Sequence, residues 1–283
     1  MRFWLPLAGL AVALGLVYTP VVRDLYHIWD TDENYSHGFL IPFFTLYLIW
    51  LGKEDLARLR PEPWGVGMGL LVAAALMRLL GALVDTVGAG TGGAFANGLS
   101  LIMALAGICL AFFGRPYFKR LFFPLAYLCF MVPLPGGVFA MVTLPLQNYA
   151  TAVTTAVLKI WGIPVLREGN LITLPGITLG VVEACSGIRS LFTLLALSAI
   201  FALVFMAKHR PWQRVVLFVS AVPVAIITNA FRVTATGVMS HYWGQEVAQG
   251  FYHDFSGWVI FIAAFIILAT EVFFFNKLAD EKL

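Results

Sequence analysis

Three segments in the second half of the chain carry side chains that together could perform acyl transfer. The first contains Cys185, the second Arg232 and the third His253. A thiolate can attack a carbonyl carbon, an imidazole can accept a proton and return it, and a guanidinium can hold the oxyanion that forms. These residue types predict a cysteine enzyme that works through a thioacyl intermediate, and this chemistry requires neither a metal ion nor a cofactor.

Other polar residues near these three could support the reaction or bind the substrate: Glu183, Ser186, Arg189, Asn229, Asp254 and His37. Arg189 rivals Arg232, because it follows Cys185 by four residues on the same predicted helix face. His37 and His241 rival His253 as the imidazole. Simpler roles stay open as well, since a cysteine can serve packing and an arginine can extend toward lipid headgroups.

The composition indicates which elements must position these residues. Hydrophobic residues make up 60% of the 283 residues and charged residues 12%, whereas soluble chains have about 45–50% and about 25%. This excludes an ordinary cytosolic domain, a disordered chain and a disulfide-stapled scaffold. The net charge of +3 is too small to indicate a nucleic-acid partner. The sequence therefore predicts an all-α integral membrane protein.

Eight apolar runs are candidates for membrane-spanning helices and form one polytopic domain over residues 1–283. They occur at about 4–22, 39–52, 64–84, 98–114, 119–135, 187–207, 213–232 and 256–276. With both termini in the cytoplasm, most basic residues fall in inside segments, as the positive-inside rule requires. In this topology Cys185, Arg232 and His253 come from three helices and share one depth at the outer surface.

The longest stretch between these runs, residues 136–186, is expected on the outer side. Its first part is predicted to be an interfacial amphipathic helix, with polar residues at helical spacing that include Gln147, Thr151 and Thr154. Its second part is predicted to form a small β-hairpin, with turns at Gly169-Asn170 and Pro175-Gly176.

Several other features favour packing over chemistry. Cys109 and Cys129 lie inside apolar runs and are expected to be buried thiols. Arg78 and Asp85, seven residues apart in the third run, are interpreted as a structural or cavity-lining pair. The glycine series at 65, 67 and 69 predicts close helix packing in lipid.

Two other classes of function compete with the enzyme. A non-enzymatic component of exopolysaccharide export, or a transporter, would line a path across the membrane with Arg78, Asp85 and Arg232. An outer-face metal site would use His37, His241, His253 and Asp254. The enzyme is favoured because its polar residues gather at the outer surface instead of the midplane, and because no HExxH-type spacing supports the metal site.

Four short motifs together resemble those of the exosortase/archaeosortase family. The stretch Glu183-Ala184-Cys185-Ser186-Gly187-Ile188-Arg189-Ser190 is similar to its cysteine motif. Asn229-Ala230-Phe231-Arg232 resembles its arginine motif and Phe251-Tyr252-His253-Asp254-Phe255-Ser256-Gly257 its histidine motif. Tyr35-Ser36-His37-Gly38-Phe39-Leu40-Ile41-Pro42 resembles a further hallmark. The four occur in order and at matching depth, and the resemblance covers most of the chain. The histidine favours the bacterial branch, since archaeal relatives can carry arginine there.

The resemblance implies a membrane cysteine protease or transpeptidase (a thiol protease) of the bacterial cytoplasmic, or inner, membrane. Such enzymes act on exported proteins with a C-terminal sorting signal: a Pro-Glu-Pro-type motif (PEP-CTERM), a spanning helix and a basic tail. They cut at the outer, periplasmic face, and the sorted proteins are often linked to extracellular polysaccharide. Hydrolysis and transfer to a membrane or envelope acceptor both stay open. The implied partners are these substrates, membrane lipids and an envelope or polysaccharide acceptor. By motif match Cys185 is the nucleophile, Arg232 the oxyanion or carboxylate partner and His253 the acid and base.

Overall fold

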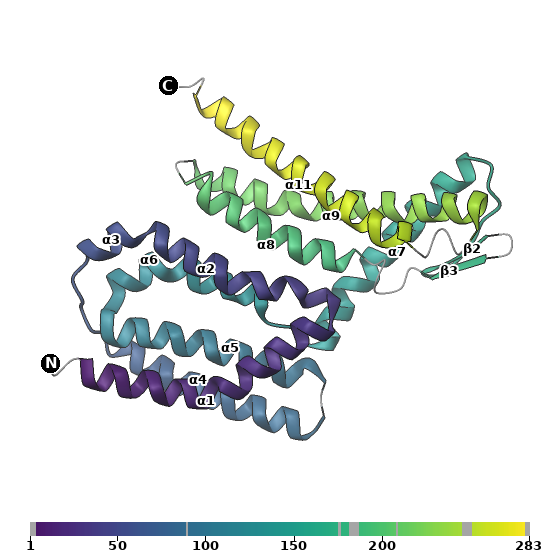
Figure 1. Cartoon of the computed structure of the whole chain (residues 1–283). Helices are drawn as coiled ribbons and strands as arrows, with labels where there is room; N and C mark the ends of the chain where they lie inside the picture. The colour runs from purple at the N-terminus through teal and green to yellow at the C-terminus, as the bar shows by residue number, and fades with distance from the viewer. Residues whose placement is uncertain are drawn as a thin grey trace. The chain divides into compact units, whose positions relative to one another are not determined.

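Figure 1 shows the computed structural model, which is mostly helical and describes residues 4–88, 90–174, 177–180, 187–207, 209–244 and 251–280. The chain divides into two compact units, Met1–Val138 and Phe139–Leu283. Each unit has its own packed interior, and each is described by itself below.

The N-terminal unit consists of helices joined by short connections. Its elements are α1 (Trp4–Thr31), η1 (Glu33–Phe39), α2 (Leu40–Leu51), α3 (Lys53–Arg58), α4 (Val66–Thr86), α5 (Thr91–Ile108), η2 (Cys109–Phe113), α6 (Gly114–Tyr127) and η3 (Leu128–Met131). Helices α4 and α5 pack closely along their length. Gly67 allows α4 to approach the end of α5 and η2, because a Cβ there would overlap the backbone of Gly107 and Ala111. Gly65 and Gly69 have no heavy atom within 4 Å of such a Cβ, so only one glycine of the predicted series serves packing.

Arg78 and Asp85 are joined through Asn97 of α5, a residue that no sequence pattern singles out. The Nη1 of Arg78 donates to Oδ1 of Asn97 (3.1 Å), and Nδ2 of Asn97 donates to Oδ2 of Asp85 (2.9 Å). Asn97 is only 3% exposed. Nε of Arg78 is buried without a hydrogen-bond partner in the described part of the chain. The link through Asn97 still favours the structural interpretation of the pair over a transport path.

Replacing Asn97 by leucine is expected to destabilise the N-terminal unit by about 1–3 kcal/mol. The isosteric side chain fills the space but leaves Arg78 and Asp85 without the amide that hydrogen-bonds to both. The thermal unfolding midpoint of the purified protein in detergent measures the effect. Thr86→Val, at an exposed side chain that binds only its own helix backbone, is the matched control. Equal midpoints for both variants would contradict a bridging role.

The C-terminal unit combines four long helices with a small sheet. Its elements are α7 (Gly136–Ile160), β1 (Leu166–Glu168), β2 (Leu171–Leu174), β3 (Ile177–Gly180), α8 (Ile188–Val204), α9 (Pro211–Trp243) and α11 (Phe251–Asp280). Helix α7 begins at the boundary between the units. Helix α9 packs against both α8 and α11. The strands are antiparallel in the order β1-β2-β3, with Glu168 opposite Leu171 and Leu174 opposite Ile177.

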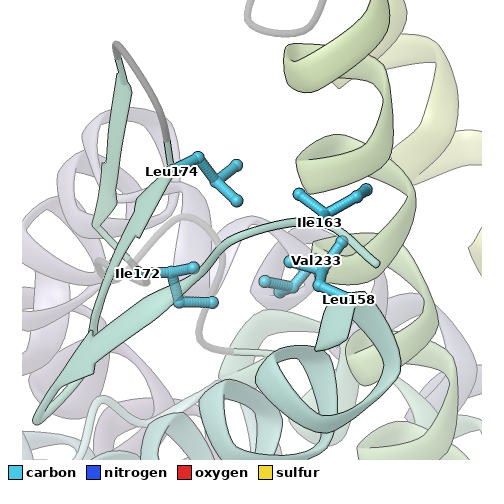
Figure 2. Packing of buried hydrophobic residues seen from close by; sticks show 5 residues of the cluster. All are labelled: Leu158, Ile163, Ile172, Leu174 and Val233. Atoms are coloured by element: carbon cyan, nitrogen blue, oxygen red, sulfur yellow. The ribbon is translucent and has the colours of Figure 1, made fainter. Parts of the chain in front are cut away.

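The predicted hairpin is therefore present and carries a third strand. The chain turns at Gly169-Asn170 as expected, with Gly169 at φ +62°. The second predicted turn, Pro175-Gly176, lies outside the described residues. The inner side of the sheet and the end of α7 bury one apolar cluster, which Figure 2 shows: Leu158, Ile163, Ile172, Leu174 and Val233. This cluster fixes the sheet to α7 and α9.

Helical residues overlap each of the eight predicted spans, although the fifth span runs four residues past the end of η3 at Met131. Within the described part of the chain, four helical runs are long and apolar enough to cross a bilayer: Val66–Thr86, Thr91–Met131, Pro211–Trp243 and Trp258–Leu278. The protein is thus a helical membrane protein, and the number of eight spans stays a prediction. Two helices extend well past the predicted ends, α1 to Thr31 and α9 to Trp243. The apolar runs stop earlier because hydropathy marks membrane depth, whereas a helix continues through polar residues.

Helix α7 faces the opposite way from an interfacial helix. Such a helix would turn its polar side chains to water, but Gln147, Thr151 and Thr154 are at most 5% exposed. The outer face is apolar instead, with Met141 77% and Ile160 81% exposed. The amphipathic period is confirmed, and its orientation is reversed. This arrangement suits a helix whose outer face contacts lipid.

Candidate active site

Cys185, Glu183 and Ser186 lie outside the described residues, and the chain next to them is resolved from Gly187 onward. Gly187 is the N-cap of α8 and adopts φ +74°, in the left-handed region that favours glycine. Helix α8 therefore begins three residues after Cys185 in the chain. The prediction that the cysteine motif leads into a helix N-terminus is consistent with this start.

The end of the cysteine motif contacts the start of the arginine motif. A Cβ at Gly187 would lie 2.7 Å from Cγ of Asn229, so only glycine permits this approach. Asn229 is 4% exposed. Gly187, Asn229, Leu146 and Leu191 also line a cavity of about 10 Å³, which is too small for more than one water molecule. Two motifs separated by some forty residues of sequence are thus brought together by α8 and α9.

Arg232 and Arg189 both lie within three residues of this contact in the sequence. Arg232 follows Asn229 by three residues in α9, so the two side chains share one face of the helix. Arg189 is the second residue of α8. Both arginines are half-buried. A cation in the first turn of a helix opposes the macrodipole, so helix stability does not explain Arg189. Arg189 and Arg232 therefore place guanidinium groups on the two helices that meet at Gly187 and Asn229, and a guanidinium can stabilise a thiolate or an oxyanion.

Helix α7 and the sheet contact the residues of α9 on either side of Arg232 in the sequence. Oγ1 of Thr234 donates to Oγ1 of Thr154 (3.2 Å), and Oγ1 of Thr154 reaches the carbonyl of Ala230 at 3.5 Å. Val233 belongs to the apolar cluster under the sheet (Figure 2). The sheet and the polar face of α7 therefore position the arginine motif, a role that the sequence did not indicate.

His253 and Asp254 fall in the first turn of α11, which begins at Phe251. Their side chains lie outside what the structure describes, so the predicted approach of the imidazole to Cys185 stays a prediction. Helix α11 packs against α8 and α9, the helices that carry the other two motifs. The three motifs therefore belong to three mutually packed helices of one unit.

His37 belongs to the N-terminal unit and binds backbone there. Its Nε2 donates to the carbonyl of Phe130 (3.1 Å), and the ring is 7% exposed. Close by, the hydroxyl of Tyr35 accepts from the N–H of Leu134 (3.1 Å), and Nε1 of Trp29 donates to the carbonyl of Met131 (2.9 Å). These contacts hold the segment 130–134 in place. A buried ring in this position fits a positioning role better than proton transfer with substrate.

His37 is expected to make the N-terminal unit sensitive to acid. Burial lowers the pKa of His37 below its ordinary value of 6.5, although the carbonyl of Phe130 opposes this. The unfolded chain then binds a proton more readily than the folded one, so stability is full above pH 6.5 and falls as the pH drops below it. Thermal midpoints at pH 7.5 and pH 5 measure the loss. His37→Gln should reduce the difference between them, and an unchanged difference would contradict the assignment.

Replacing Gly187 by alanine is expected to lower both stability and cleavage. A left-handed conformation costs a non-glycine residue about 1–2 kcal/mol, and the new Cβ must also displace Asn229. Gly162→Ala is the matched control, because Gly162 ends α7 in a left-handed cap with φ +75° and has no heavy atom within 4 Å of an added Cβ. We expect similar backbone strain in both variants but at least about tenfold slower cleavage only in Gly187→Ala. Equal cleavage by both would separate the Gly187–Asn229 contact from the site.

The two other cysteines differ in their exposure to solvent. Cys109 is buried as predicted, but Cys129 is exposed, so its assignment as a buried thiol was wrong. An apolar surface position in a membrane helix looks like a core position in sequence, because lipid and core are equally apolar.

His241 lies in the last turn of α9, exposed and with its ring against Tyr242. In the described part of the chain, no three His, Cys, Asp or Glu side chains gather as a metal site.

One acidic residue inside a predicted span was passed over. Glu271 of α11 accepts a hydrogen bond from Oγ of Ser220 in α9 (2.5 Å). Its signal was available, because an acidic residue in an apolar run is costly in lipid and requires a partner. The pair ties α11 to α9, the two helices that carry the histidine and arginine motifs.

Residues 29–270 match the family of transmembrane exosortases (Exosortase_EpsH), and this range contains all four motifs and the greater part of each unit. No curated protein and no solved structure matches the chain. Because the match extends over most of the sequence, this chain belongs to the transmembrane exosortase family.

Proposed function

We propose that this protein is a membrane cysteine peptidase or transpeptidase that cleaves C-terminal sorting signals of exported proteins. Its place is the bacterial inner membrane, with both termini in the cytoplasm and the site at the periplasmic face. The contact between Gly187 and Asn229 carries the proposal. Two peptide units span at most about 7 Å, so chain connectivity keeps Cys185 near the helix face that presents Asn229 and Arg232.

In the proposed reaction the Cys185 thiolate attacks the carbonyl carbon of the scissile peptide bond. The thiol proton passes to the imidazole of His253, and the guanidinium of Arg232 stabilises the tetrahedral oxyanion. When the C–N bond breaks, the imidazolium returns the proton to the leaving amine. The product is a thioester on Cys185 and a free C-terminal fragment with its spanning helix. A water molecule or an acceptor nucleophile then releases the acyl group.

The supporting residues have roles that follow from where they lie. Asn229 positions the start of α8, Arg189 contributes positive potential at the same place, and Glu183, Ser186 and Asp254 flank the reacting groups in sequence. A substrate with its own spanning helix must enter from the lipid, because its apolar segment does not leave the bilayer. The export-component alternative receives less support, since Asn97 hydrogen-bonds to both Arg78 and Asp85.

The experiment co-expresses the protein with an exported reporter that ends in a Pro-Glu-Pro signal, a spanning helix and a basic tail. We expect release of a shortened reporter only when the enzyme is present. A second reporter in which glycine and serine replace the Pro-Glu-Pro residues is the matched control and should stay uncut. Processing of both reporters alike, or of neither at normal enzyme abundance, would contradict the proposal.

A further inference from the structure

The outer face of α7 carries a groove that the proposed reaction does not use. Its volume is about 490 Å³, within the range of about 300–1,000 Å³ that is usual for small-molecule sites. It is lined by Leu144, Pro145, Asn148, Tyr149 and Ala152 of α7, together with Arg167 of β1. The groove thus combines an apolar floor with one guanidinium group.

The guanidinium of Arg167 is held at this groove by backbone groups. Its Nη2 donates to the carbonyl of Asn148 (3.2 Å), and its Nε donates to the carbonyl of Gly169 (3.0 Å). An arginine has five N–H donors, so these two bonds fix the plane of the group and leave donors for an anion. Neither carbonyl neutralises the charge, and Arg167 remains exposed.

The charged groups nearest in sequence do not offset this cation within the groove. Glu168 is the next residue of β1, and consecutive strand residues point to opposite faces. Lys159 is exposed in the last turn of α7 and does not line the groove. The charge of the groove therefore favours an anionic ligand.

The apolar requirement comes from the face of α7 on which the groove lies. Leu144 is 55% and Tyr149 64% exposed, and the side of α7 that carries Tyr149 continues through Val153 and Ile160. In a membrane protein such a face contacts acyl chains, and tyrosine rings favour the level of the headgroups. A ligand that suits both requirements has an acyl chain for the floor and a phosphate for Arg167.

We propose that the groove on α7 binds a membrane phospholipid, with its phosphate on Arg167 and an acyl chain along Leu144 to Ala152. Guanidinium and phosphate form charge-assisted, bidentate hydrogen bonds. The apolar floor takes a chain that neither a free anion nor a soluble metabolite supplies. This site is independent of cleavage, because none of its residues belongs to the three motifs.

Native mass spectrometry of the protein purified in mild detergent tests the proposal by titration with phosphatidylglycerol. We expect one bound lipid per protein, and about tenfold weaker binding in Arg167→Gln, the loss that corresponds to one charge-assisted interaction. Lys159→Gln removes an exposed charge from the same segment and should bind like the wild type. Ala152→Phe fills the groove while keeping Arg167 and should also bind weakly, which covers the case in which Arg167→Gln fails to fold.

Two further ligands distinguish the contribution of the phosphate to binding from that of the acyl chains. Diacylglycerol supplies the acyl chains without phosphate, and inorganic phosphate supplies the anion without chains, so both should bind much more weakly than phosphatidylglycerol. Wild-type affinity in Arg167→Gln or in Ala152→Phe would overturn the proposal. So would displacement of the lipid by equimolar inorganic phosphate, which would indicate a free-anion site. Tighter binding of a sorting-signal peptide in the groove would assign it to the substrate instead.

Discussion

Replacing Cys185 by alanine is expected to abolish cleavage of the reporter, with a loss of at least about 10⁴-fold. Removal of a catalytic nucleophile leaves only the acceleration that binding and oxyanion stabilisation provide. The two other cysteines supply matched controls, because Cys109 is buried and Cys129 is exposed. Cys109→Ala and Cys129→Ala should cleave at rates within a few-fold of the wild type at equal abundance. Immunoblots of the reporter and the enzyme measure both quantities.

Cleavage by Cys185→Ala at the wild-type rate would exclude a thioacyl mechanism. The export-component alternative would then become the leading interpretation. Loss of cleavage in Cys109→Ala, with Cys185→Ala active, would instead move the nucleophile into the N-terminal unit.

Replacing Arg232 by glutamine is expected to lower the cleavage rate by about 10²–10³-fold, the loss seen when one oxyanion donor is removed. The proposed role of Arg232 rests on the motif resemblance. Arg232 follows by three residues in α9 the Asn229 that contacts the end of the cysteine motif. Arg189→Gln is the matched control and should lose less. Arg232→Lys keeps the charge but not the planar fork, so its rate should lie between those of the wild type and Arg232→Gln.

A large loss in Arg189→Gln with a small loss in Arg232→Gln would exchange the two roles. Thermal midpoints are needed beside the rates, since both residues are half-buried. A loss of cleavage at an unchanged midpoint separates chemistry from folding.

The sequence predicted the positions of the helices along the chain better than it predicted which face of each helix is buried. Every apolar run overlaps helical residues, and in the described part of the chain four helical runs are long and apolar enough to cross a bilayer. Helix α7 shows what such runs leave open. The spacing of Gln147, Thr151 and Thr154 establishes two faces, but not which of them is inside. In water the polar face turns outward, whereas against lipid a polar face is more stable when buried on other helices.

The candidate site was predictable as residue types and only partly as geometry. The approach of Gly187 to Asn229 depends on the packing of α8 on α9, which no local pattern contains. His37 illustrates the same limit. Its type suggested chemistry, but its partner is the carbonyl of Phe130, which is 93 residues away in the chain. Asn97 gave no signal in sequence because single buried amides are common in helices that pack in membranes.

The most direct test of the central claim is detection of the thioester on Cys185. Purified enzyme is mixed with a sorting-signal substrate, stopped in acid within the first turnovers and digested for mass spectrometry. The account predicts an adduct of the substrate's acyl fragment on the peptide that contains Cys185, absent in Cys185→Ala and released by hydroxylamine. Rapid cleavage by wild-type enzyme with no adduct on Cys185 at any time, or with an adduct on another residue, would contradict it.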